Sequence, residues 1–390
     1  MYISCAAPCA SLYSVCVNRS IMSQMLALGG VACTTKTSIL KRLQLLHSEE
    51  FVVHLHDYKE LNDKYNFDAR TGGILFAAYR TGDAAAYRRD YKRVHVFDRQ
   101  PMEALVYATV HQDVDNADAL RMFNTCKSMG LCDGWTNVLL EPVDGTEELV
   151  AEQMRARDNK LDVYSAEYVV KQKNKFRLWR TVVDGDALTV DWRANLNAQQ
   201  DSIVAAVRSK LEIWQIVNGD NGTIDVAIYA HRLPLLTNKI AGFDLNGTLI
   251  ETKSGGVFAM NDNDWKLKYT NTTNKLTELL DADYTIVVMT NEQGITKNTN
   301  LTALSSAFKK KIETLCRTID LPMFVVASCR TKYRKPRTGL FECVRKKQPM
   351  LNVEKSFYCG NNADGTNCND LQFAENCGIK FYYDYKYFNM

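Results

Sequence analysis

Short apolar runs alternate with segments of helical periodicity along most of the chain, and this alternation constrains the fold more than any other feature. Strands alternating with helices form parallel sheets covered by helices, so the sequence predicts an α/β fold. The apolar runs predict strands at residues 25–28, 51–55, 93–97, 135–140, 180–183, 240–243, 284–289, 323–327 and 356–359. Helical spacing of apolar residues predicts helices at 36–46, 102–111, 146–157 and 198–214.

The length of the chain and one turn-rich segment predict two domains. The chain has 390 residues, whereas one domain has about 100–200. The run Asn-Gly-Asp-Asn-Gly at residues 218–222 has the composition of a turn and marks a seam. We therefore expect an N-terminal extension at 1–22, one domain at 23–217 and a second domain at 224–390.

Composition excludes several classes of protein. Lys and Arg number 48 against 45 Asp and Glu, so an anionic partner must be bound by local basic clusters and not by a global field. The hydrophobic share of 46% excludes a disordered chain. The 12 cysteines form no Cys-x-x-Cys pair, which favours free thiols in a reducing intracellular compartment, cytoplasmic or nuclear. No run of 18 apolar residues occurs, so we expect no membrane span.

A glycine-containing loop lies between the first predicted strand and the first predicted helix. Gly30 opens the string Gly-Val-Ala-Cys-Thr-Thr-Lys-Thr, which ends in Lys36 and Thr37 and approaches the pattern G-x-x-x-x-G-K-[ST]. In such loops backbone N–H groups hold phosphates, the lysine pairs with phosphate oxygens and the hydroxyl binds Mg²⁺. Thr35 replaces the second glycine, and a β-branched residue is strained there if φ is positive. The loop predicts ATP and Mg²⁺ as cofactors, and the alternative is an ordinary turn with a surface lysine.

Two further charged groups accompany this loop. Asp98 and Arg99 follow the predicted strand at 93–97, at the edge of the sheet where the loop lies. Arg155 and Arg157 lie beside a polar stretch that suits a lid over phosphates. A surface ion pair and a solvated helix face are the alternatives for these residues.

Together these residues resemble the thymidylate kinase and deoxynucleoside kinase family over residues 23–215. The resemblance implies a P-loop kinase fold in which Lys36 and Asp98 act in catalysis. It also implies that Arg70 and Arg99 bind the acceptor, a nucleoside monophosphate. Gly30, Thr35, Lys36, Thr37, Arg155 and Arg157 would then bind the nucleoside triphosphate, with Thr37 on the metal.

Polar residues follow the predicted strands of the second half. Asp244 follows the strand at 240–243, and Thr290 and Asn291 follow the strand at 284–289. The carboxyl ends of parallel strands meet at one edge of a sheet, so these side chains are expected to share one crevice. The string Phe-Asp-Leu-Asn-Gly-Thr-Leu around Asp244 resembles the D-x-D-G-T-[LV] motif of the haloacid dehalogenase phosphatase superfamily. That chemistry uses the first carboxylate as nucleophile and the second for proton transfer.

Ordered blocks narrow this resemblance to the 3′-phosphatase domain of polynucleotide kinase/phosphatase over about 225–390. The blocks lie at residues 252–255, 263–265, 289–295, 334–339 and 373–381. The resemblance implies a haloacid dehalogenase-like Rossmannoid fold with Asp244 as nucleophile and Lys335 offsetting charge on the phosphoryl group. Substrate phosphates would contact Thr290, Asn291, Arg330, Arg334 and Arg337, although a solvated loop is the alternative for the arginines.

Two positions depart from the family pattern. Asn246 stands where the catalytic acid–base Asp belongs, and Asn361 stands where the family has an Asp that binds Mg²⁺. The metal site carried over from the family is Asp244, Asn246, Asn361 and Asp370, and Asp364 is close enough in sequence to substitute. An amide cannot transfer a proton, so the sequence predicts a slow phosphatase.

The chain therefore resembles a P-loop kinase joined to a 3′-phosphatase. In the familiar end-healing enzymes the phosphatase precedes the kinase, and the reverse order here suggests large DNA viruses of insects. Three hypotheses stay open at this point. The chain is a nucleoside monophosphate kinase with a 3′-phosphatase domain, a polynucleotide 5′-hydroxyl kinase with an open groove, or a non-catalytic protein that binds nucleic-acid ends. The groove would be lined by Arg88, Arg89, Lys92 and Arg93. A homodimer through the kinase domain is a further expectation.

Overall fold

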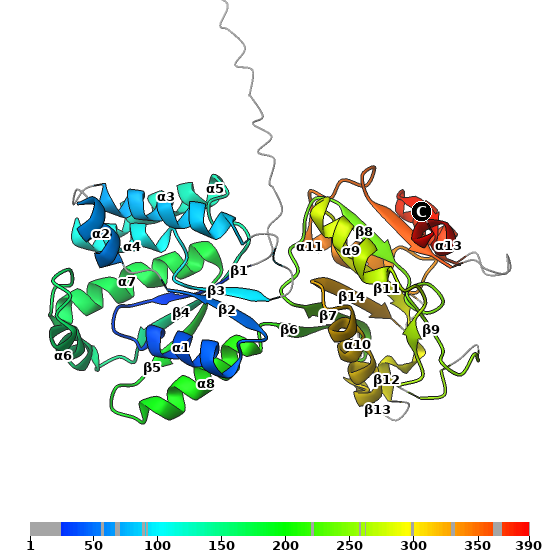
Figure 1. Ribbon diagram of the computed structural model, residues 1–390, viewed down its shortest axis with the longest axis horizontal. Coiled ribbons are helices and arrows are strands. Elements are labelled where there is room, and N and C mark those ends of the chain that lie inside the picture. Colours follow the sequence, from blue (N-terminus) through cyan, green and yellow to red (C-terminus); the bar gives the residue numbers. More distant parts are fainter. Residues whose placement is uncertain are drawn as a thin grey trace, which may run out of the picture.

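Two α/β units follow one another along the chain (Figure 1). The computed structural model describes residues 25–389 except 56–57, 67–70, 88–89, 91–92, 220–221, 257–258, 262, 298–299, 329–331 and 362–368. The predicted N-terminal extension at 1–22 lies outside the described residues. Each unit is built on its own main sheet.

The first sheet is parallel throughout. Its strands, in spatial order, are β2 (Phe51–His54), β3 (Val94–Asp98), β1 (Met25–Gly30), β4 (Trp135–Pro142) and β5 (Asp186–Val190). The central strand β1 is buried along its whole length, as expected of a strand covered on both faces. The loop after β1 therefore emerges at the middle of the carboxyl edge.

Helices cover both faces of this sheet (Figure 1). They are α1 (Lys36–Leu46), α2 (Tyr58–Tyr65), α3 (Gly72–Ala85), α4 (Glu103–His111), α5 (Asn116–Ser128), α6 (Glu147–Arg157), α7 (Ala166–Val183) and α8 (Leu196–Arg208). Helices α1 and α8 bury Leu40 and Val204 against one face. Helices α4 and α7 bury Val106 and Trp179 on the other.

The second main sheet is mixed. Its order is β16 (Lys380–Tyr383), β15 (Phe357–Gly360), β8 (Ile240–Phe243), β11 (Thr285–Asn291), β14 (Met323–Ser328), β7 (Ile224–His231) and β6 (Glu212–Asn218). The strands from β16 to β14 are parallel, whereas β7 and β6 run antiparallel at one edge. The ends of β8, β11 and β15 therefore open on one edge.

Smaller elements complete this second unit. The helices are α9 (Thr272–Asp281), α10 (Ser306–Ile319), α11 (Gly339–Lys347), α12 (Asn369–Cys377), α13 (Asp384–Phe388) and the 3-10 turn η1 (Gln293–Ile295). Two small sheets pair β9 (Ile250–Glu251) with β10 (Lys266–Leu267), and β12 (Thr296–Lys297) with β13 (Asn300–Leu304). Helices α9 and α10 pack on one face of the main sheet, and α11 and α12 on the other.

The α/β prediction is confirmed, and so are all predicted strands but one. The expectation of a parallel sheet in both units holds for the first sheet only, because β7 and β6 add antiparallel pairs to the second. Residues 180–183 are the end of α7 and not a strand, because Val182 continues the buried helical face of Trp179. The helix predicted at 198–214 ends at Arg208, and its last residues belong to β6. There the Trp214 ring packs on Tyr229 of β7.

The predicted seam has a different role in the structure. Strand β6 pairs with β7, so the segment around Gly219 and Gly222 is the turn of a hairpin inside the second sheet. Sheet membership therefore changes between α8 and β6, ahead of the predicted boundary. The two units are in contact, because Leu233 packs into the core between the first sheet and α1.

Two general expectations can be compared with the described residues. Their cysteines are free thiols: Cys33, Cys126, Cys132, Cys316, Cys343, Cys359 and Cys377. In the part of the chain that is described, no helix has the length and apolar character needed to cross a membrane.

Candidate functional site

Asp244 lies at the carboxyl edge of the second sheet. It follows β8, and its backbone N–H donates to the carbonyl oxygen of Cys359 on β15 at 2.9 Å. Its side chain is 11% exposed, so one side of the carboxylate reaches the crevice while the rest is enclosed. The expectation that Asp244 shares an edge with the residues after β11 agrees with the parallel pairing of β8 and β11.

A buried lysine links this carboxylate to a second one. The Lys335 ammonium donates to Asp244 Oδ1 at 2.5 Å, to Asp370 Oδ1 at 2.6 Å and to the Tyr358 hydroxyl at 2.7 Å. Burial alone would lower the pKa of Lys335, but the two carboxylates outweigh it and raise that pKa. Burial and then the Asp370 charge raise the pKa of Asp244 to about 7, against the opposing effect of Lys335. Lys335 therefore keeps its charge and holds two repelling carboxylates together.

The two polar residues at the end of β11 have different roles. The Thr290 hydroxyl is buried and has no hydrogen-bond partner among the described residues. The Asn291 side chain is occupied, because it accepts from the Lys335 N–H at 2.9 Å and donates to the Lys335 carbonyl at 3.0 Å. Thr290 is thus available to a ligand, whereas the Asn291 amide positions the backbone of Lys335.

The donor set suits a hard cation. Mg²⁺ prefers oxygen ligands and is usually held by one or two carboxylates together with substrate phosphates. Asp244 and Asp370 converge on one ammonium, and Asp370 Oδ2 accepts from the Asn361 N–H at 3.1 Å. Gly360 permits this approach, since a Cβ there would lie 2.5 Å from the Asp370 Cβ. Asp244 and Asp370 suit the ion, and Asn361 adjoins Asp370 through its backbone, although no described cluster of three or more His, Cys, Asp or Glu is placed for a metal.

Asn246 does not join this donor set through its side chain. Its Nδ2 donates to Glu292 Oε1 at 2.5 Å, and its Oδ1 accepts from the Lys311 ammonium at 3.1 Å. The sequence pattern missed Glu292, Lys311 and Tyr358. Of these three residues, Glu292 carries a signal in the sequence, because it is a carboxylate directly after Asn291 at the end of a strand.

The basic residues near the site are partly described. Arg334 is half-buried and Arg337 is exposed, and both flank the buried Lys335. Arg330 and Asp364 lie outside the described residues. Contact of Arg334 and Arg337 with a substrate phosphate stays a prediction.

The glycine loop of the first unit has the expected local geometry. Gly30 has φ 102°, and a Cβ there would lie 2.2 Å from the carbonyl oxygen of Leu140, so this position requires glycine. The Lys36 ammonium turns back on the loop, where it donates to the carbonyls of Gly30, at 3.2 Å, and of Val31. Burial lowers the pKa of Lys36 to about 7. The lysine is enclosed and lies beside acceptors that a phosphate can replace.

Thr35 has the backbone conformation that glycine favours. Its φ is 60° and its ψ is 13°, in the left-handed region, directly before α1. Its hydroxyl is buried and has no hydrogen-bond partner in the described part of the chain. The strain expected from the sequence is therefore present. Thr37, in the first turn of α1, is exposed.

Asp98 and Arg99 lie beside the loop, joined by two residues that the sequence pattern missed. Arg99 is half-buried, with its guanidinium over the Tyr107 ring, 4.9 Å from the centroid, and one Asp98 oxygen has no described hydrogen-bond partner. Glu103 accepts from the Gly30 N–H at 3.1 Å, and Arg80 donates to the Asp98 carbonyl at 2.5 Å. The charged residues are therefore part of a buried network and not a surface ion pair.

The two arginines predicted to form a lid have different partners. Arg157 donates to Asp162 at 2.6 Å, and Arg155 pairs with Glu148. Burial raises the pKa of the Cys33 thiol in the loop, and the charges of Arg157 and Lys36 oppose this. Arg157 thus acts electrostatically on the loop. Arg70, Arg88, Arg89 and Lys92 lie outside the described residues.

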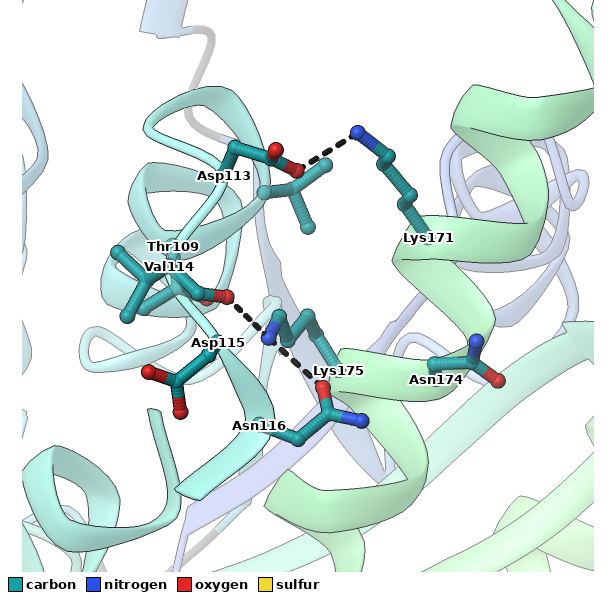
Figure 2. A pocket seen from close by; sticks show the side chains of 9 residues that line it. Thr109, Asp113, Val114, Asp115, Asn116, Lys171, Asn174 and Lys175 are labelled. Atoms are coloured by element: carbon teal, nitrogen blue, oxygen red, sulfur yellow. Dashed lines mark hydrogen bonds and ion pairs between the residues drawn. The ribbon is translucent and has the colours of Figure 1, made fainter. Parts of the chain in front are cut away.

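A separate cavity of about 350 Å³ lies between α7 and the segment joining α4 to α5 (Figure 2). Its charged groups have partners: Lys171 donates to Asp113 at 2.6 Å, and Lys175 donates to Asn116 at 2.8 Å. None of the predicted site residues lines it. We therefore place the candidate sites at the two sheet edges and not in this cavity.

The two folds and their sites define the class of protein. In the first sheet, the strand order and the lysine-bearing loop between β1 and α1 form a P-loop kinase fold. In the second, the sheet order, with a carboxylate after β8 bound to a buried lysine, is that of a haloacid dehalogenase-like fold. The chain is a two-domain protein of the phosphoryl-transfer class.

The chain belongs to the polynucleotide kinase 3 phosphatase family, whose model matches residues 239–388. It is 38% identical over 219 residues to an uncharacterized 33.9 kDa protein in the PE 3′ region of Lymantria dispar multicapsid nuclear polyhedrosis virus, covering 56% of this chain and 73% of that one. The expectation of a resemblance to viral proteins is confirmed by this match.

Two characterised proteins are also similar. The bifunctional polynucleotide phosphatase/kinase of Schizosaccharomyces pombe is 34% identical over 192 residues, which cover 47% of this chain but only 45% of that protein. The solved structure of a deoxyadenosine kinase from M. mycoides has a TM-score of 0.35 and 16% identity, and covers 47% of this chain and 98% of that one.

Proposed function

We propose that the C-terminal domain removes terminal 3′-phosphates from nucleic acids through an aspartyl-phosphate on Asp244. The observation that carries this proposal is the buried cluster of Asp244, Lys335 and Asp370 beside the unpartnered hydroxyl of Thr290. A nucleophile, a fixed positive charge and a free donor meet at one sheet edge. The family model supplies the substrate class, and Arg334 and Arg337 suit the backbone phosphates of a strand.

The residues divide the chemistry among themselves. Asp244 attacks phosphorus in line with the leaving 3′-oxygen, which breaks the ester bond and leaves the phosphoryl group on the carboxylate. Lys335 and the Thr290 hydroxyl stabilise the oxygens on which charge develops. When bound to Asp244, Asp370 and Asn361, Mg²⁺ supplies further positive charge at the phosphoryl group. Water then hydrolyses the acyl phosphate and regenerates Asp244.

We expect this reaction to be slow. Loss of a general acid or base lowers a rate by about 10²–10⁴, and Asn246 occupies that position of the motif. Asn361 replaces a charged ligand with a neutral one, which weakens a hard-cation site.

Phosphate release from a 3′-phosphorylated oligonucleotide tests this proposal. The full chain with Mg²⁺ should release phosphate, and Asp244→Asn should abolish release. Glu375→Gln, on an exposed residue of α12, is the matched control and should leave release unchanged. Equal release by the Asp244→Asn protein and the unmodified chain would exclude the aspartyl-phosphate route.

We also propose that the N-terminal domain is an ATP-dependent kinase of nucleoside monophosphates. Support comes from the position of Lys36, enclosed by the loop, and from Arg99, whose side chain is 23% exposed beside Asp98. A largely enclosed guanidinium suits a small enclosed acceptor better than an open nucleic-acid groove. Asp98 would orient the acceptor hydroxyl or phosphate, and Arg157 would close over the transferred group. A dimer through this domain stays a prediction.

Labelled ATP offered with either thymidine monophosphate or a 5′-hydroxyl oligonucleotide separates the alternatives. We expect transfer to the mononucleotide and its loss in Lys36→Ala, with exposed Lys41→Ala as control. Transfer to the oligonucleotide instead would identify a polynucleotide kinase. Binding of nucleic-acid ends without transfer to either acceptor would identify a non-catalytic protein.

A further inference from the structure

A carboxylate lies beside the amide that departs from the phosphatase motif. Glu292 follows β11 directly, and its Oε1 accepts from Asn246 Nδ2 at 2.5 Å. The pairing of β8 with β11 places Val288 opposite Phe243, so the chain segments just past both strand ends run side by side. The Glu292 side chain is 14% exposed at this edge. A carboxylate is therefore present where the motif lacks one, although it comes from the neighbouring strand.

The orientation of Asn246 is fixed from both sides. The Lys311 ammonium from α10 donates to Asn246 Oδ1 at 3.1 Å, so the NH₂ group of the amide must face Glu292. Lys311 also lies 3.4 Å from Glu292 Oε1, which holds the three side chains in one group. The second Glu292 oxygen accepts only a long contact, 3.5 Å from the Lys311 ammonium, and a carboxylate oxygen has lone pairs for a further partner.

We propose that Glu292 transfers the proton in the phosphatase reaction and that Asn246 is its positioning residue. This proposal rests on the function proposed above for Asp244. The carboxylate required by the chemistry has moved from the second position of the β8 motif to the first position after Asn291. The reaction then has an acid–base group at a different place in the sequence from the motif, so the loss of rate expected from Asn246 is smaller than it would be without any carboxylate there.

The proposed step balances as follows. In the first half, Asp244 forms a bond to phosphorus, the P–O3′ bond breaks, and the Glu292 proton passes to O3′ to give a 3′-hydroxyl. In the second half, the Glu292 carboxylate takes a proton from water, and the resulting hydroxide attacks phosphorus. The bond between Asp244 and phosphorus breaks, inorganic phosphate leaves, and Glu292 is protonated again.

Leaving-group dependence distinguishes this role from a structural ion pair with Lys311. An alkoxide leaving group needs a proton, whereas p-nitrophenolate leaves without one. In Glu292→Gln, formation of the aspartyl-phosphate from a 3′-phosphorylated oligonucleotide should slow by about 10²-fold or more. With p-nitrophenyl phosphate the same variant should give a rapid burst of p-nitrophenol and then slow turnover, because only the second half needs the base. Equal slowing of the first step with both substrates would overturn the proposal.

Returning the carboxylate to the motif position provides a second test. The double variant Asn246→Asp with Glu292→Gln exchanges acid and amide while keeping the pair. On the oligonucleotide, the double variant should react at least tenfold faster than the Glu292→Gln single variant. No recovery, together with an unchanged fold by circular dichroism, would contradict a transferable proton-carrying role. Glu375→Gln is again the control.

The two proposals fail in different ways. If Glu292→Gln retains full oligonucleotide turnover while Asp244→Asn has none, the phosphatase function stands and Glu292 is not its acid–base group. If the unmodified chain releases phosphate from neither substrate, both the proposed function and the proposed role of Glu292 are wrong.

Discussion

Replacing Thr35 with glycine should stabilise the N-terminal domain, although glycine normally weakens the start of a helix. Thr35 has φ 60° and ψ 13°, a conformation that costs a residue with a Cβ about 1–2 kcal/mol. Its buried hydroxyl, unpartnered among the described residues, adds a cost of about 1–3 kcal/mol. Both costs disappear in Thr35→Gly.

The greater freedom of glycine in the unfolded chain opposes this gain by about 0.4–1 kcal/mol. The expected net stabilisation is about 1–5 kcal/mol, which corresponds to about 2–4 °C in Tm for each kcal/mol in a domain of this size. Thr35→Ala should recover only part of the gain, because it removes the hydroxyl but keeps the Cβ. Thr37→Gly, inside α1, should destabilise the domain by about 1 kcal/mol.

Hydrogen exchange of the β1 and β4 amides in increasing urea reports unfolding of this domain separately from the other. The expected order of stability is Thr35→Gly, then Thr35→Ala, then the unmodified chain, then Thr37→Gly. If Thr35→Gly is no more stable than Thr35→Ala, the left-handed backbone carries no strain and the reasoning is refuted.

Three further predictions concern the charged groups of the two sites. Burial lowers the pKa of Lys36 to about 7, and a bound phosphate favours the charged form of this lysine. The affinity for a nucleoside triphosphate should therefore fall by up to tenfold per pH unit above about 7. Calorimetry should show proton uptake when the triphosphate binds. Lys335→Met should destabilise the C-terminal domain by about 3–5 kcal/mol in urea unfolding, and adding Asp370→Asn should recover part of this loss; no recovery would mean that the carboxylates do not repel. Asn361→Asp should tighten Mg²⁺ binding about tenfold in titrations with the metal alone, and unchanged affinity would remove Asn361 from the metal site.

The elements of the fold follow closely from the sequence where strands are short, apolar and buried on both faces. Strand β1 and the start of α1 are predicted to within a few residues, because the apolar run, the glycine and the helical spacing agree. The sequence predicts a strand at the end of α7, since β-branched residues there favour extended structure locally, whereas packing on the sheet favours the helix. The pairing of β6 with β7 depends on contacts across the chain that no local pattern contains.

The sequence predicts which residues lie at the site, but it does not predict which of them form hydrogen bonds with one another. The position of Asp244 after a buried strand follows from the motif, and so does the nearness of Thr290. The hydrogen bond from the Asn291 amide to the Lys335 backbone joins residues 44 apart in the sequence, so no local sequence pattern predicts it. The same holds for Glu292, whose closeness to Asn246 results from the register of β8 against β11.

The buried lysines of the two sites illustrate why residue type alone does not determine function. Lys36 contacts backbone carbonyls, which offset burial only weakly, and its pKa falls to about 7. Lys335 contacts two carboxylates, which outweigh burial, and its pKa rises. Near neutral pH Lys36 is therefore only partly protonated, and an anion that binds beside it favours its charged form. The charge of the loop thus depends on whether phosphate is bound. The charge on Lys335 is permanent near neutral pH, so it can hold Asp244 in place before substrate arrives and offset charge on the phosphoryl group afterwards.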